Sequence, residues 1–361
     1  MKRYHIYTLL ALLTAFAQMA SAQKVELYSV GALNDNRLVY ALPTTMISIA
    51  VTSDVIKEEP GPLSLYAERF LGTQDAVMEP AERYRLKEVS IFPQGIADEE
   101  QRYAIEFKRN SEATNVALTP DGILVGINIE EVEAIAQPTD VLPDPNGWDL
   151  SFDAAFPLEY IQATTAAAKA RILADNIYRI RENRDLVISG ESEQPFADGE
   201  ALQFAVHRLD QQERAYVRQF NGIKASQTAV QVVDRLSPTE TGQRVVARFS
   251  EQLGLLPADD LRGEPIYLDI KIIEQAAVLD EKEQQRLERR LKKGIVYRIP
   301  GSVRASVIYK GQTWSTRQLP VAQLGSLEAL DMVLFNTKGK TTVVEIYPTN
   351  GGLKSVREAD Q

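Results

Sequence analysis

Residues 294–320 have the sequence GIVYRIPGSVRASVIYKGQTWSTRQLP, and this segment carries the clearest indication of fold class. Three runs within it, residues 295–299, 304–309 and 312–319, contain the β-branched and aromatic residues that strands favour. Lys310-Gly311 supplies a turn between the last two runs. Short strands at such close spacing are typical of an antiparallel sandwich or barrel.

Similar signals extend outward in both directions along the chain. Further strands are predicted at residues 37–40, 45–51, 83–91 and 104–107, and again at residues 228–233, 242–249, 265–273 and 341–347. A hairpin is predicted for residues 114–129, because Pro120-Asp121-Gly122 forms a tight-turn motif between two apolar runs. Strands are therefore expected on both sides of the middle of the chain.

The middle of the chain has helical spacing instead. Apolar side chains three and four positions apart predict one helix from Pro157 to about residue 180 and a second over residues 199–220, which Asn221-Gly222 ends. Shorter helices are predicted at residues 63–71, before Gly72, and at residues 281–293, where Asp280 and Glu283 resemble a capping box.

These elements together predict a strand-dominated α+β fold, with two β-sandwich- or barrel-like units separated by a helical hairpin. The corresponding domains are an N-terminal β-rich domain at residues 23–150, the helical hairpin at residues 151–222 and a C-terminal β-rich domain at residues 223–361. A Pro-rich linker at residues 138–149 precedes the helices.

Residues 1–22 have the features of a signal peptide. Lys2 and Arg3 precede an apolar stretch, and Ala20-Ser21-Ala22 then predicts cleavage before Gln23. A membrane anchor is the alternative, but the apolar run is shorter than the roughly 20 residues needed to span a bilayer. We expect an exported protein, periplasmic or associated with the outer membrane, with no transmembrane segment in the mature chain.

Composition argues against several classes of function. The chain has no cysteine, and His207 is the one histidine after the leader, so Cys–His and Ser–His–Asp catalysis and Cys/His zinc sites are disfavoured. A net charge of -10 argues against a nucleic-acid partner. Asp140, Asp144 and Asp149 lack the spacing of an EF-hand. We therefore predict no cofactor, no metal and no catalytic residue.

Two groups of polar residues keep a hydrolase open as an alternative. Two carboxylates suffice for glycoside hydrolysis. Tyr66, Glu68 and Arg69 lie near Asp75, and a second group consists of Asp259, Asp260, Arg262 and Glu264. Both groups are equally compatible with solvated turns and surface ion pairs.

An ordered series of motifs runs along almost the whole mature chain. Its members include Leu42-Pro43-Thr44-Thr45, Tyr66-Ala67-Glu68-Arg69-Phe70-Leu71-Gly72, Pro120-Asp121-Gly122, Phe220-Asn221-Gly222, Tyr297-Arg298-Ile299-Pro300-Gly301, Val321-Ala322-Gln323-Leu324-Gly325 and Tyr347-Pro348-Thr349-Asn350-Gly351. The series resembles the DUF4831 family of exported Bacteroidota proteins, whose function is unassigned. The resemblance implies a cell-envelope location and supplies no catalytic residue.

The Tyr and Arg residues of these motifs are candidates for binding a protein partner, because both types are favoured at interface hot spots. The candidate binding residues are Tyr66, Glu68 and Arg69 on the short helix, together with Tyr297 and Arg298. The alternative for the short helix is packing on the protein's own sheet. The sequence thus predicts a non-catalytic binding or assembly module of the bacterial cell envelope, with a carboxylate-dependent hydrolase of an envelope glycan as the alternative.

Overall fold

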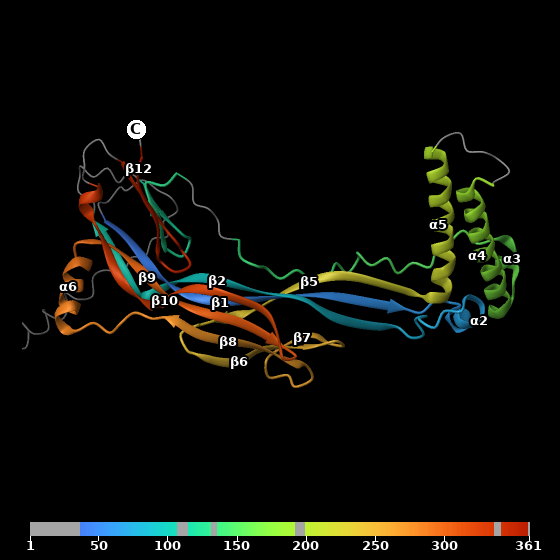
Figure 1. The fold of residues 1–361 in the computed structure, drawn as a ribbon, viewed down its shortest axis with the longest axis horizontal. Coiled ribbons are helices and arrows are strands. Elements are labelled where there is room, and N and C mark those ends of the chain that lie inside the picture. The colour runs from blue at the N-terminus through green and yellow to red at the C-terminus, as the bar shows by residue number, and fades with distance from the viewer. Residues whose placement is uncertain (1–36, 107–114, 131–135, 192–198, 336–340, 360–361) are drawn as a thin grey trace, which may run out of the picture.

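The computed structural model describes residues 37–106, 115–130, 136–191, 199–335 and 341–359. The molecule is elongated, with a group of helices at one end and most of the sheet structure in the centre and at the other end (Figure 1). All strand pairs within its three sheets are antiparallel. The predicted strand-dominated α+β class is confirmed.

Long strands connect the two ends of the molecule. β1 (Arg37–Glu59) pairs with β2 (Ala81–Glu106) on one side and with β5 (Ile223–Leu236) on the other. The predicted strands at residues 37–40 and 45–51 are therefore parts of one strand, which continues through a register shift between Ala41 and Pro43. Opposite this shift, residues 98–101 of β2 bulge out of the ladder.

A five-stranded sheet has the order β10-β9-β8-β6-β7. Its strands are β6 (Gly242–Ser250), β7 (Gly254–Leu256), β8 (Glu264–Glu274), β9 (Gly294–Tyr309) and β10 (Gln312–Asp331). The turn predicted at Lys310-Gly311 is confirmed, with both residues at positive φ (49° and 75°), as a two-residue hairpin loop requires. The sheet packs on β1 and β2 through a core of Ile, Val and Leu side chains.

A four-stranded sheet has the order β12-β11-β4-β3. It contains β3 (Val116–Leu118), β4 (Leu124–Ile127), β11 (Thr341–Ile346) and β12 (Leu353–Ala359). The predicted hairpin between β3 and β4 is confirmed, with Gly122 at φ 83° in the turn, although residue 114, its predicted start, lies outside the described residues. A second core, which includes Tyr40, Ile127 and Phe335, lies beneath this sheet and reaches the start of β9.

The helices at the far end form what we call the helical head. It consists of the short helix η1–α2 (Ser64–Tyr66 and Ala67–Leu71), α3 (Leu158–Gln162), α4 (Ala166–Ser189) and α5 (Gly199–Asn221). The prediction of one unbroken helix from Pro157 is wrong. Residues 163–165 interrupt it, because Ala163 and Thr165 are extended and the Thr165 side chain caps α4 by accepting from the Ala168 amide.

Near the opposite end, α6 (Glu281–Leu291) lies on β9 and β10. Its predicted capping box between Asp280 and Glu283 is confirmed. Within the described part of the chain, none of the helices is both long and apolar enough to cross a membrane.

Strands that precede α3, α4 and α5 in the chain share two of the sheets with strands that follow these helices. β1 and β2 pair with β5, and β3 and β4 share a sheet with β11 and β12. The division of the chain into three domains stays a prediction, but these pairings show that residues on either side of the helices complete each other's sheets.

Candidate functional site

The predicted binding residues lie in two separate places. Tyr66, Glu68 and Arg69 belong to η1–α2 in the helical head, whereas Tyr297 and Arg298 belong to β9. The short helix lies at one end of the molecule, whereas β9 lies in the sheets away from the helical head (Figure 1). A single surface containing all five residues is therefore not formed.

Tyr66 is partly buried against the core of the helical head. Its ring lies 6.3 Å from that of Phe70, and the exposed Arg69 guanidinium lies 5.3 Å from the Phe70 ring. The short helix packs on α4 and α5. The Leu63 amide donates to the Gln219 carbonyl of α5 (2.8 Å), and the Tyr178 hydroxyl of α4 donates to the Phe70 carbonyl (2.9 Å). Packing within the head thus buries part of the Tyr66 side chain, whereas the side chains of Glu68 and Arg69 remain exposed.

The tip of the helical head exposes large apolar side chains that the sequence analysis did not single out. Phe204 of α5 is 68% exposed and Ile188 of α4 is 64% exposed. Ile188 also lines a shallow hollow of 310 Å³ with Leu202, Val206 and His207. His207 is exposed there, and its Nε2 lies 2.8 Å from the Gln211 amide nitrogen. The sequence contained one sign of this exposed surface. Phe204 is a large apolar residue that lies outside the apolar stripe predicted to be buried on its helix.

An ion-pair network joins the two long helices below this tip. Arg181 pairs with Glu213, and Arg184 pairs with both Asp210 and Glu213. Burial alone would raise the pKa of Glu213, but the two arginines donate to it and hold its pKa below the usual range. The network holds α4 against α5, and it lines an open cleft of 600 Å³.

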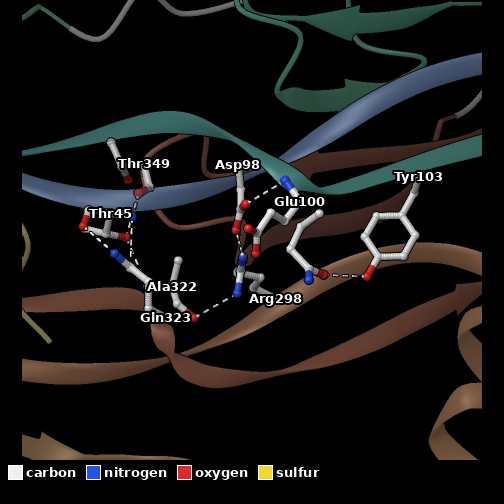
Figure 2. A network of polar contacts seen from close by, with 9 residues as sticks. Thr45, Asp98, Glu100, Tyr103, Arg298, Ala322, Gln323 and Thr349 are labelled. Carbon is white, nitrogen blue, oxygen red and sulfur yellow. Dashed lines mark hydrogen bonds and ion pairs between the residues drawn. The ribbon is translucent and has the colours of Figure 1, made fainter. Parts of the chain in front are cut away.

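Arg298 is a buried cation in the junction between β2, β9 and β10 (Figure 2). Its Nη2 donates to the Asp98 carboxylate (3.1 Å), and its Nη1 donates to the Ala322 carbonyl (3.4 Å). Its backbone amide donates to the Gly351 carbonyl (2.8 Å). Burial lowers the pKa of the Arg298 guanidinium. With 8% of its surface exposed, Arg298 holds parts of this chain together and offers little to a partner.

Thr45 and Gln323 form the second half of the same junction (Figure 2). The Thr45 amide donates to Gln323 Oε1 (3.0 Å), and Gln323 Nε2 donates back to the Thr45 carbonyl (2.8 Å). The Thr45 hydroxyl donates to the Thr349 carbonyl (2.9 Å) and accepts from the Ala322 amide (3.0 Å). Four motifs far apart in sequence therefore meet here, because Thr45, Arg298, Gln323 and Thr349 each belong to one of them.

Glycine is required where these segments touch. A Cβ on Gly95 would lie 1.9 Å from the Pro348 carbonyl oxygen, and a Cβ on Gly325 would lie 1.9 Å from that of Ile299. No side chain fits at such distances. The junction thus explains Thr45, Arg298, Gln323 and Gly325 of the motif series as structural requirements.

The aspartates of the Pro-rich linker also have structural partners. Asp140 accepts from the Val232 amide of β5 (2.7 Å), and Asp149 pairs with Arg218 of α5 (2.8 Å). Asp144 accepts from the Asn146 amide (2.9 Å). In the described ranges, His, Cys, Asp and Glu form no group of three or more that could hold a metal ion.

Among the carboxyl groups considered for hydrolysis, that of Asp260 forms an ion pair with Arg262. Arg262 donates to Asp260 and lowers the pKa of that carboxyl group to about 2. Glu68 accepts from the Gln74 amide (3.3 Å). Every described carboxyl group with a resolved pKa shift is shifted downward; these groups are Asp54, Asp149, Glu213, Asp260 and Glu345. A general acid in glycoside hydrolysis needs the opposite shift.

Comparison with known protein families supports the resemblance noted in the sequence. The family model described as "Domain of unknown function (DUF4831)" matches residues 36–354. The chain therefore belongs to this family. Neither the curated proteins nor the solved structures contain a match.

Proposed function

We propose that this member of the DUF4831 family is an exported, non-catalytic binding or assembly module of the bacterial cell envelope, and that its helical head binds a protein partner. The observation that carries the proposal is the placement of exposed apolar side chains at the tip of the head. Phe204 and Ile188 each expose more than half of their surface there. Ile188 adjoins Leu202 and Val206 in the hollow, whereas Phe204 lies on the opposite side of α5, so the tip exposes apolar surface on both sides of this helix. Exposed apolar surface of this kind marks protein-contact sites.

The ribbon of β1, β2 and β5 carries the helical head away from the rest of the molecule (Figure 1). A partner on the tip would therefore contact the head without contacting the sheets. The joint between ribbon and head is tight, because a Cβ on Gly61 would lie 2.2 Å from the Gln219 carbonyl oxygen. Such close packing supports a fixed orientation of the head, which lowers the entropy cost of binding.

Export is the second part of the proposal, and it rests on the leader sequence. Lys2-Arg3 and Ala20-Ser21-Ala22 predict cleavage by a signal peptidase. Mass spectrometry of the native protein should find Gln23 as its first residue. Recovery of intact Met1 from the envelope fraction would contradict export with cleavage.

Site-specific photo-crosslinking in the native host tests the role of the tip. A photoreactive amino acid at Phe204 should give a discrete adduct, whereas the same group at Leu261 should not. Leu261 is a suitable control, because it is 80% exposed and lies in the loop between β7 and β8, outside the helical head. Equal labelling from both positions, or none from Phe204, would contradict a partner at the tip.

An assay with purified envelope glycans addresses the hydrolase alternative. We expect no release of sugar, because the described carboxyl groups with shifted pKa values are all held in the ionised form. Turnover that is lost when a single carboxylate is replaced would favour the hydrolase instead.

A further inference from the structure

A pocket of 560 Å³ lies in the part of the molecule farthest from the helical head. Its walls come from the end of β2, the C-terminal end of α6 and the start of β9, which Figure 1 shows together at that end. This volume is within the range of about 300–1,000 Å³ that is usual for small-molecule sites.

The floor of the pocket is apolar. Ile105 of β2 and Val296 of β9 are 5% and 1% exposed, and both belong to the second core. Leu291 of α6 and Met332 are partly buried beside them. The apolar lining is thus continuous with the second core, and Leu291 and Met332 keep apolar surface that an alkyl chain would cover.

The rim of the pocket carries a net positive charge. Lys292 and Lys293 follow α6 directly and are exposed, and neither forms an ion pair with any residue that the structure describes. Glu288 is the one acidic group among the lining residues. The neighbouring Arg290 is paired with Glu328 (3.0 Å) and does not line the pocket, so Lys292 and Lys293 are the cations among the described lining residues.

Helix α6 covers the pocket with few apolar contacts of its own. Leu287 is its one buried residue. The segment that leads into α6 is exposed, with Val278 fully accessible. A ligand under α6 would therefore add contacts to Leu291 that the protein alone does not make.

We propose that this pocket binds a single-chain amphiphile with a carboxylate head, such as a fatty acid. The carboxylate pairs with Lys292 and Lys293 at the rim, and the alkyl chain lies on Leu291 and Met332, above the buried Ile105 and Val296. An apolar lining next to two lysines that form no ion pair with the described residues has the complementary arrangement for this ligand class. The site is independent of the proposed partner of the helical head.

Calorimetric titration of the purified mature chain with decanoate tests the proposal, with 1-decanol as the uncharged probe. Decanoate should bind saturably and more tightly than decanol. The double variant K292Q/K293Q should bind decanoate about tenfold more weakly, because a charge-assisted contact is lost. The variant K282Q/R286Q removes equal charge from exposed positions of α6 that do not line the pocket, and it should bind decanoate as the wild type does.

Filling the pocket provides a second test. Ala104 lines it and is exposed, so Ala104→Trp should abolish decanoate binding while a circular dichroism melt verifies the fold. No saturable binding to the wild type would overturn the proposal, and so would wild-type affinity in K292Q/K293Q. Persistent binding in a folded Ala104→Trp variant would place the ligand elsewhere and would also overturn it.

Discussion

Replacing Asp98 by alanine should destabilise the protein strongly, because it leaves the Arg298 guanidinium buried without its counter-ion. The Arg298 side chain is 10% exposed, and its Nε already has no hydrogen-bond partner. Breaking one side of a buried ion pair costs about 3–5 kcal/mol. The Asp98 carboxylate keeps 22% of its surface in water, so we expect the lower end of that range, about 3 kcal/mol.

Urea unfolding followed by circular dichroism measures this effect, and a thermal melt should show Tm lowered by about 5–10 °C. The double variant Asp98→Ala/Arg298→Met removes the charge along with its partner, so it should recover at least half of the lost free energy of unfolding. Asp149→Ala is the matched control. It breaks an Asp–Arg pair at 2.8 Å whose members are 68% and 40% exposed, and it should leave Tm unchanged.

Two results would refute this reasoning. One is a change of less than about 0.5 kcal/mol in Asp98→Ala, which is the size expected at an ordinary surface position. The other is a double variant that is less stable than the single variant. That result would show that Arg298 stabilises the junction without Asp98, through its contact with the Ala322 carbonyl.

Gly95→Ala should lower the free energy of unfolding by about 2 kcal/mol or more, because its Cβ would meet a carbonyl oxygen at 1.9 Å; Gly199→Ala, with open space around it, should be neutral in the same urea titration. Hydrogen bonding from Arg85 holds the pKa of Asp54 below its usual value, so the ionised Asp54 stabilises the folded state. This stabilisation is fully present above the unfolded pKa of about 4 and is lost as pH falls through the folded pKa. Asp54→Asn should therefore be less stable than the wild type at pH 7, and thermal melts should show the difference shrinking in acid. Tyr66→Ala should lower the free energy of unfolding by about 2 kcal/mol, because the Tyr66 ring packs on the core of the helical head. An unchanged thermal melt would contradict this packing role and favour Tyr66 as a residue that contacts a partner.

Local signals in the sequence predicted most individual elements correctly. Turns at Lys310-Gly311 and Gly122, the αL end of α2 at Gly72 and the capping box at Asp280 all occur where they were expected. Each depends on a few neighbouring residues whose backbone preferences act without help from the rest of the chain.

The candidate site was harder to predict, because burial depends on residues far away in sequence. Arg298 was expected at a contact surface, yet it is buried, and its ion-pair partner Asp98 lies 200 positions away in the sequence. The exposed tip of the helical head was missed for the complementary reason. Phe204 is exposed because α4 and α5 pack through other faces. The spacing of apolar residues in one helix does not specify which face packs on its neighbour.

The amino-acid sequence on its own therefore determined the strand-rich class, the family resemblance, and the turns and helix caps, since these follow from the conformational preferences of short segments. Only the tertiary structure decided that short predicted strands join into the long β1, β2 and β9, and that strands on either side of the helices share sheets. It alone also brought Thr45, Arg298, Gln323 and Thr349 into one junction. The physical reason is that strand pairing and the burial of polar groups require hydrogen-bond partners from distant segments, and those partners exist only when the whole chain has folded.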